Sequence, residues 1–582
     1  MPYVFAFVKV SAFCVNSLQS RPAPLKCPYV LQSITPIAIK ETLHIRRNWA
    51  FCLILLSVLG VGILITAPYA NFQDFLSQGD HGRDLYAAQA VYRGELPYKD
   101  FWWVYGPLMP YYYGLFFKIL GTKISSMILG KLILRILGGI LICLGLMEVS
   151  SPIAAFLCAC WFMLFQQDFF FTYNHLGGIV MVLGVAFCLL SYIQKKSSKA
   201  AWGTLGFILP LCLIKINFGL AALAVCVITV GVCDLVRHIP FNTPKKIFYI
   251  VSFIGLPLLI FIIYWSLLKG LSVMEMRQCL PYMEGDQPYA MSPWMAISNF
   301  LQITWHTITS NWTNLTFAVI INASALRCFY LFAKNKLPAS RRTILVLSLG
   351  MLCLFYAANF HEYLKSGVWY RSFWAQPLSI MITFLLIDIA TQSVPKVVRK
   401  IVFTFLAGLA IYCWLLVGRQ LIAAKTENQY LSLPRGGIYL TNSPSWITTV
   451  KQTTEFLNKT LKPNELFFAL PYDCLYYYLT GKKTPTRQLI FFEHIKIPRS
   501  QEKSVIAELE KNHVNYILLS SRAFARQEPG LGFLGTSYCP LIGKYIQDNF
   551  VPIARFGDWN HEPGWAWNHG TLILKRKQKT SQ

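Results

Sequence analysis

The sequence has 582 residues, of which 55% are hydrophobic and only 14% are charged, and its mean hydropathy is +0.45. A soluble domain of ordinary size cannot bury so much apolar surface, so the composition excludes that class and indicates a membrane protein. The net charge of +27 does not indicate a nucleic-acid partner, because many Lys and Arg residues fall in short loops between apolar segments.

The first 48 residues contain several basic residues, Pro and Ser, and lack the cleavage pattern of a signal peptide. We expect residues 1–48 to be a cytoplasmic extension, or to lie upstream of the natural start site, because the recognisable pattern begins only near Trp49.

Residues 49–423 contain eleven apolar segments, which predict a polytopic α-helical membrane domain with about eleven transmembrane helices. Basic residues concentrate in alternate loops, at 195–199, 237–246, 334–342 and 396–400. The positive-inside rule therefore predicts that these loops and the N-terminus are cytoplasmic. The segments are 49–69, 124–147, 152–166, 175–193, 201–216, 218–236, 247–268, 313–333, 343–359, 373–391 and 401–422.

Residues 424–582 have a mixed polar composition and predict a small extracytoplasmic α/β domain. Ser443 followed by Pro444 is a helix start signal. Cys474 and Cys539 fall in this region and are candidates for a disulfide if it is extracytoplasmic. The predicted strands are 465–470, 514–520 and 571–575, and the predicted helices are 445–460, 501–512 and 539–549.

The most informative motif follows the first apolar segment, in a predicted outer loop at 71–123. It reads Gly79-Asp80-His81-Gly82 and Tyr86-Ala87-Ala88, then Gly94-Glu95-Leu96-Pro97-Tyr98-Lys99-Asp100, and ends in Tyr105-Gly106-Pro107-Leu108 before an aromatic amphipathic helix. This pattern resembles bacterial members of glycosyltransferase family 39, a GT-C family similar to the protein O-mannosyltransferases and the aminoarabinose lipid A transferases. The resemblance implies a GT-C-like fold that transfers a sugar, with inversion, from a polyprenyl-phosphate carrier on the outer face of a membrane.

The resemblance implies that Asp80 is the general base for the acceptor. A carboxylate at the membrane surface can accept a proton from an attacking hydroxyl or amine, so the chemistry is plausible without the family. Asp84 either shares this site or pairs with Arg83, and Tyr86 of the same motif is a candidate for substrate binding. The alternative is that both carboxylates only keep an outer loop solvated.

Two later segments supply further candidates. Asp168 matches an acidic position of the superfamily, as a second catalytic carboxylate or a ligand of the sugar hydroxyls, and Tyr173 and Asn174 follow it in a pattern that resembles the same relatives. The alternative there is an interfacial aromatic belt. Lys215 and Asn217, in a Lys-x-Asn-x-Gly pattern, resemble the basic position near the carrier phosphate. Independently of the resemblance, a Lys at this depth in the membrane is costly and usually marks function. The alternative is that Lys215 snorkels to the interface.

The connection before the tenth apolar segment contains His361, Glu362, Lys365 and Arg371. A guanidinium near the outer face can form paired hydrogen bonds with phosphate oxygens, so we expect Arg371, or Lys365 in its place, to bind the leaving phosphate. His361 and Glu362 are weaker candidates, and solvated charge is the alternative. The run from Pro471-Tyr472 to Pro485 resembles the C-terminal domains of the same family, in which it would cap the site or contact the acceptor.

The sequence contains no P-loop, dinucleotide fingerprint or nucleophile elbow, so a nucleotide-sugar donor is not supported. We predict no cofactor and no metal ligand set, although Asp80, Asp84 and Asp168 leave a divalent cation open. The predicted partners are the polyprenyl-phosphate sugar, a lipid, glycan or protein acceptor, and membrane lipids, in a bacterial inner membrane. The rival functions are a transporter or flippase of lipid-linked sugars and a catalytically inactive relative.

Overall fold

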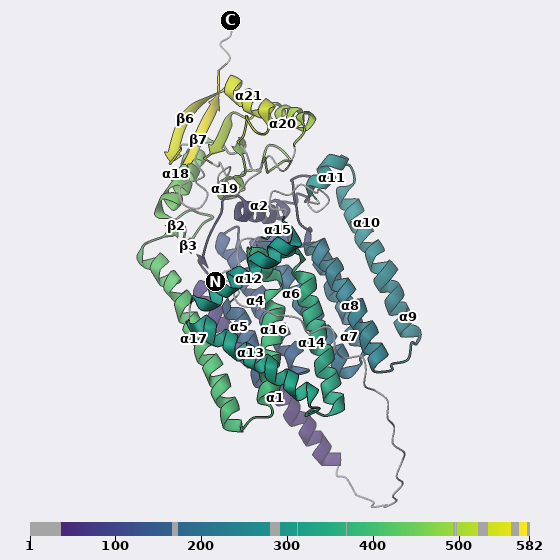
Figure 1. The fold of residues 1–582 in the computed structure, drawn as a ribbon. Coiled ribbons are helices and arrows are strands. Elements are labelled where there is room, and N and C mark those ends of the chain that lie inside the picture. The colour runs from purple at the N-terminus through teal and green to yellow at the C-terminus, as the bar shows by residue number, and fades with distance from the viewer. Residues whose placement is uncertain are drawn as a thin grey trace, which may run out of the picture.

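The computed structural model describes residues 37–165, 173–279, 291–310, 312–367, 369–492, 495, 497–521, 533–559 and 570–578. Long helices form a bundle, and two small β-sheets with several short helices gather at one end of it (Figure 1). The predicted fold class, an α-helical polytopic membrane protein with a small C-terminal α/β domain, is therefore confirmed.

Eight spans among the described residues are long and apolar enough to cross a membrane. Three shorter apolar helices occupy the remaining predicted segments, so the count of eleven crossing helices stays a prediction. The eight spans are Cys52–Tyr69, which covers the end of α1 (Ile37–Thr66), α4 (Ile124–Met147), α6 (Tyr173–Lys195), α8 (Ile216–Val236), Thr243–Leu268 with α9 (Thr243–Ile250) and α10 (Leu256–Leu268), Asn314–Ala333 in α13 (Trp312–Ala333), Ala339–Ser366 with α14 (Ala339–Asn359) and α15 (His361–Ser366), and α17 (Lys396–Thr426). The shorter helices are α5 (Pro152–Phe165), α7 (Ser198–Ile214) and α16 (Gln376–Thr391).

The predicted outer loop contains two helices that pack together, α2 (Asp80–Tyr92) and α3 (Leu108–Leu120). Helix α2 lies at one end of the bundle, which we call the α2 end (Figure 1). The loop also contains β1 (Phe72–Gln73), which pairs in parallel with β3 (Ile438–Leu440), and β3 pairs with β2 (Tyr430–Leu431). The sheet therefore ties the loop after α1 to the chain that follows α17.

The C-terminal region has the strands and helices that the sequence predicts. Its sheet has the order β4-β5-β7-β6. Cys474 and Cys539 are both buried free thiols, so the disulfide considered from the sequence is wrong. The elements are α18 (Pro444–Thr460), β4 (Phe467–Leu470), α19 (Cys474–Thr480), α20 (Arg499–Lys511), β5 (Tyr516–Ser520), α21 (Pro540–Asn549), β6 (Phe550–Gly557) and β7 (Gly570–Arg576).

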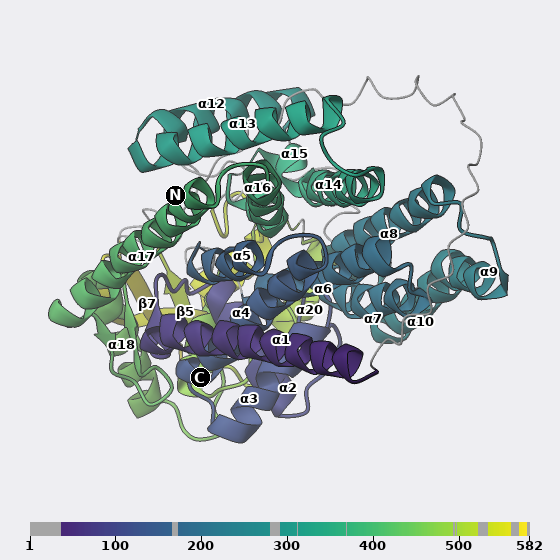
Figure 2. The same cartoon turned by 90° about the horizontal axis from the view of Figure 1, so that it is seen from below.

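The connection after α10 contains helices that the sequence analysis did not predict, α11 (Val273–Cys279) and α12 (Pro293–Thr309). Ser292 caps α12 by accepting a hydrogen bond from the backbone N–H of Met295 at 3.2 Å. Viewed along the bundle, α12 and α13 lie side by side on one flank, while α7, α8 and α10 lie on another (Figure 2).

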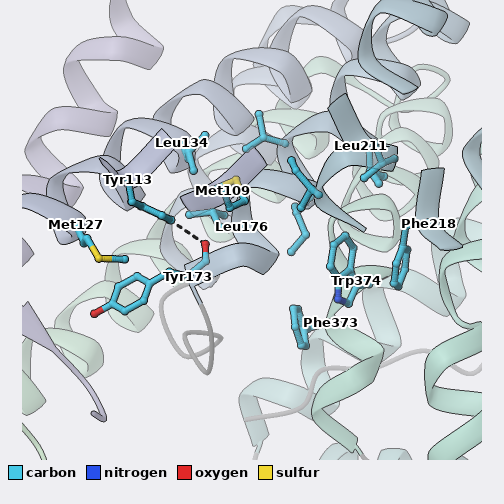
Figure 3. Close-up of a cluster of buried hydrophobic side chains, with 14 of the residues drawn as sticks. Met109, Tyr113, Met127, Leu134, Tyr173, Leu176, Leu211, Phe218, Phe373 and Trp374 are labelled. Carbon is cyan, nitrogen blue, oxygen red and sulfur yellow. Dashed lines mark hydrogen bonds between the residues drawn. The ribbon is translucent and has the colours of Figure 1, made fainter. Parts of the chain in front are cut away.

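A buried apolar cluster lies where α3, α4, α6 and α8 meet the short helix η5 (Trp369–Trp374) (Figure 3). The Tyr113 hydroxyl donates to the backbone carbonyl of Tyr173 at 2.8 Å, and the rings of Phe218 and Trp374 stack with centroids 3.9 Å apart. This packing fixes the first turn of α6 and the start of α8, which both contribute polar residues to the α2 end.

Candidate active site at the α2 end

Asp80 is the first residue of α2, where the partial positive charge of a helix N-terminus favours a carboxylate. Its side chain is 37% exposed. Oδ1 accepts hydrogen bonds from the Tyr472 hydroxyl at 2.9 Å and from Arg83 Nη1 at 3.4 Å. Within the described part of the chain no donor contacts Oδ2, so one oxygen of this carboxylate is left to accept a proton.

Asp84 forms a buried ion pair with Arg83, as one of the two roles considered from the sequence requires. Asp84 Oδ1 accepts from Arg83 Nε at 2.9 Å and Nη2 at 2.8 Å, and its Oδ2 accepts from the backbone N–H of Tyr173 at 2.9 Å. Burial raises the pKa of the Asp84 carboxyl to about 6, and the neighbouring Arg83 charge opposes this shift. Both carboxylate oxygens have protein donors, so Asp84 positions Arg83, whose Nη1 then points to Tyr472 and Asp80.

The ring of Tyr105 joins the Asp80 group to a second polar group. The backbone N–H of Gly106 donates to the carbonyl of Ile214 at 2.9 Å, and a Cβ on Gly106 would lie 2.0 Å from the carbonyl oxygen of Leu213. Only glycine permits this approach, which brings the preceding Tyr105 to the junction of α7 and α8. The Arg83 guanidinium then lies 4.9 Å, and Lys215 Nζ 5.7 Å, from the centroid of the Tyr105 ring.

Lys215 is the extended residue between α7 and α8, so it lies at a helix junction rather than within a helix. Its Nζ is 2.5 Å from Glu362 Oε1, and the two side chains are only 6% and 3% exposed. Asn217 Nδ2 donates to the same Glu362 oxygen at 3.2 Å and is 2.8 Å from His361 Nε2. Two distant segments that the sequence singled out for substrate binding are therefore in direct contact.

Arg371 and His175 complete this second group. Arg371, in η5, lies within electrostatic range of both Lys215 and His175. The His175 ring packs edge-on against Tyr105 and Trp374, with centroids 5.5 Å and 5.3 Å away. Sequence reasoning gave no role to Tyr105 or His175, although each stands inside a motif that it singled out. It gave Tyr472 only the role of its run, which was to cap the site or contact the acceptor.

Other predicted residues have supporting or separate contacts. The Tyr86 hydroxyl accepts from the backbone N–H of Thr484 at 3.1 Å, so this fully buried side chain joins α2 to the C-terminal region. Tyr173 and Asn174 are buried at the start of α6, and Lys365 is half-buried on α15. Asp168 lies outside the described residues. Among the described residues, no group of three His, Cys, Asp or Glu side chains could hold a metal ion.

The α2 end thus brings together residues from five parts of the chain. A carboxylate with one open oxygen lies beside Arg83, and the Tyr105 ring connects this group to Lys215, which Glu362 pairs with and which Arg371 approaches. Such an arrangement can accept a proton on one side and stabilise a departing anion on the other.

Comparison with known proteins finds no family model and no curated protein that matches this chain. Solved structures with similar folds include the arabinofuranosyltransferase AftD from Mycobacteria, at 14% identity and a TM-score of 0.49 over 92% of this chain; the chain spans only 40% of that protein. ArnT from Cupriavidus metallidurans bound to undecaprenyl phosphate has 11% identity and a TM-score of 0.49, with 90% of this chain and 98% of that one covered. The oligosaccharyltransferase AglB from Archaeoglobus fulgidus, in complex with an inhibitory peptide and a dolichol-phosphate, has 11% identity and a TM-score of 0.47, with coverages of 82% and 70%.

Proposed function

We propose that this chain is an integral membrane glycosyltransferase, which transfers a sugar with inversion from a polyprenyl-phosphate donor to an envelope lipid, glycan or protein. The observation that carries the proposal is the meeting, at one end of a bundle of apolar helices, of Asp80 and the cations Lys215 and Arg371. These residues are far apart in the sequence. The motif resemblance assigns Asp80 and Lys215 to one reaction, and the chemistry of a guanidinium near the outer face assigns Arg371 to the same phosphate.

In the proposed reaction Asp80 Oδ2 takes the proton from an acceptor hydroxyl or amine. The acceptor atom forms a bond to the anomeric carbon, and the bond from that carbon to the phosphate oxygen breaks. The electron pair leaves with the polyprenyl phosphate, whose growing negative charge is stabilised by Lys215 and Arg371. Attack opposite the leaving group inverts the anomeric centre. No covalent sugar–enzyme intermediate is needed, so one carboxylate suffices.

The bundle suits a polyprenyl chain because its helices expose large apolar side chains along their length, as at Leu258, Phe261 and Trp265 of α10. The polyprenyl tail can remain in the lipid while the phosphate reaches the α2 end. We place that end on the outer face of a bacterial inner membrane, because the basic loops lie at the opposite ends of their helices.

A transporter or flippase of lipid-linked sugars is the second candidate. Buried charges such as Lys215 and Glu362 occur in both classes. The enzyme is favoured by Asp80, because a partly exposed carboxylate with one oxygen held by donors and the other open is an arrangement for proton transfer rather than for passage of a large lipid.

The decisive experiment uses the purified full chain in liposomes with a panel of undecaprenyl-phosphate sugars and extracted envelope lipids as acceptors. Asp80→Asn keeps the shape of the side chain and removes its basicity, so transfer should fall at least about 10²-fold while binding of undecaprenyl phosphate persists. Asp100→Asn is the matched control, because Asp100 is an exposed carboxylate of the same loop. Full activity of both Asp80→Asn and Asp168→Asn, or flipping of the lipid without transfer, would replace the enzyme by the transporter.

A further inference from the structure

Tyr472 reaches the candidate base from a segment 392 residues further along the chain. Its hydroxyl donates to Asp80 Oδ1 at 2.9 Å and accepts from Arg83 Nη1 at 3.0 Å. The side chain is 2% exposed, and its ring packs edge-on against Phe492 with a centroid distance of 5.6 Å. Burial raises the pKa of the Tyr472 phenol well above its ordinary value, so the hydroxyl keeps the proton that it donates.

The backbone around Tyr472 is held from two sides. Towards α2, the N–H of Leu475 donates to the carbonyl of Gln78 at 3.1 Å, and a Cβ on Gly82 would lie only 2.4 Å from the Leu475 nitrogen. Towards the sheet, Asp473 Oδ2 accepts from the Ser520 hydroxyl at 2.5 Å. The phenol is therefore delivered to Asp80 by a rigid contact between α2 and the C-terminal region, rather than by a free side chain.

We infer that Tyr472 is a positioning residue for Asp80, so that the C-terminal region completes the active site instead of only covering it. Because the phenol holds Oδ1, it fixes the direction in which Oδ2 points towards the acceptor. The same hydrogen bond leaves Oδ2 as the oxygen that takes the proton of the acceptor. Among the residues that the structure describes, the other charged and titratable groups near Asp80 are Arg83, Asp84 and Tyr105. The catalytic role rests on the proposed function, whereas the contact stands on geometry.

The test measures the protonation of Asp80 without requiring sugar transfer. Dicyclohexylcarbodiimide reacts with protonated carboxyls, and fragment-ion mass spectrometry of the full-length protein separates labelling at Asp80 from labelling at Asp84. Tyr472→Phe removes the hydroxyl but keeps the ring, so half-maximal labelling of Asp80 should occur at a pH higher by about half a unit to one unit. Tyr478→Phe is the matched control, because its hydroxyl also joins the C-terminal region to the first loop, through the Thr122 carbonyl at 3.2 Å.

Replacement of Tyr472 by 3-fluorotyrosine keeps the packing and makes the hydroxyl a stronger hydrogen-bond donor, so half-maximal labelling of Asp80 should occur at a lower pH. This second variant tests the inference even if Tyr472→Phe fails to fold. In the transfer assay, Tyr472→Phe should lower kcat about tenfold and leave KM unchanged. Unchanged labelling in both Tyr472 variants, or an equal shift in Tyr478→Phe, would overturn the inference. If the protein transfers sugar but the pH of half-maximal labelling does not shift in the Tyr472 variants, only the role of Tyr472 is refuted. If that pH shifts but neither the unaltered protein nor any variant transfers sugar, the proposed glycosyltransferase function is refuted.

Discussion

At the scale of single residues, the proposed binding of a phosphate by Lys215 and Arg371 can be tested by mutation. Lys215→Ala and Arg371→Ala should each weaken binding of undecaprenyl phosphate to the detergent-purified protein by about 1.5 to 3 kcal/mol, the range for a hydrogen bond to a charged group. Microscale thermophoresis gives the two dissociation constants. Unchanged affinity in both variants would remove the phosphate from this position.

Replacement of Glu362, the ion-pair partner of Lys215, should change the affinity for undecaprenyl phosphate in the opposite direction. Glu362 Oε1 lies 2.5 Å from Lys215 Nζ and forms an ion pair with it, so an incoming phosphate must compete with this carboxylate for Lys215. Glu362→Gln keeps an oxygen acceptor for Asn217 but removes the competing charge, and affinity for undecaprenyl phosphate should rise about tenfold, which corresponds to about 1.4 kcal/mol. Glu455→Gln, at an exposed carboxylate on α18, should leave the affinity unchanged. A loss of affinity in Glu362→Gln would mean that Glu362 orients Lys215 for the ligand.

Asp84 should matter for folding more than for chemistry. Arg83 and Asp84 are each 3% exposed, and removing one partner of a buried ion pair leaves an uncompensated charge, at a cost of about 3 to 5 kcal/mol. Asp84→Asn should therefore lower the melting temperature in detergent clearly, whereas Asp80→Asn should barely change it. A melting temperature for Asp84→Asn equal to that of the unaltered protein would contradict the positioning role.

At the scale of elements, the site depends on the contact between the loop before α3 and the junction of α7 and α8. Gly106→Ala would place a Cβ 2.0 Å from the Leu213 carbonyl oxygen, so the loop must move and separate Tyr105 from Lys215. We expect binding of undecaprenyl phosphate to fall about tenfold or more, measured as above. Gly206→Ala on α7 meets no atom within 4 Å and is the matched control, which should bind normally. Equal affinities of the two variants would show that this contact does not shape the site.

The missed α12 shows where reading elements from the sequence failed. Its start, Ser292 followed by Pro293, has the same signal as Ser443 and Pro444 at the start of α18, and both Ser hydroxyls cap their helices in the structure. The polar sequence after residue 424 lets the signal at 443 stand out as the start of a helix. The signal at 292 lies between two apolar segments, where the sequence predicts only a connection.

At the scale of the whole molecule, the basic loops lie at the ends of the helices that are opposite the α2 end. Lys215, Glu362 and Trp374 lie at the α2 end, so the other ends of α7, α14 and α16 carry the basic loops at 195–199, 334–342 and 396–400. A reporter fused after Lys196 should therefore report the cytoplasm, and one fused after Gln582 the outer side. Alkaline phosphatase and green fluorescent protein fusions give the readout. The reverse result would put Asp80 in the cytoplasm and contradict the proposed reaction.

The sequence by itself determined the membrane class, the positions of most long helices and of strands β4, β5 and β7, because apolar runs and local alternation are properties of neighbouring residues. It also selected Asp80, Lys215 and Arg371 one motif at a time. Only the tertiary structure decided that Asp84 pairs with Arg83, that Glu362 occupies Lys215, and that Tyr472 holds Asp80. The physical reason is that each of these contacts depends on how helix ends and loops pack together, and Tyr472 and Asp80 are 392 residues apart. The energy of a buried charge depends on partners that no local pattern contains.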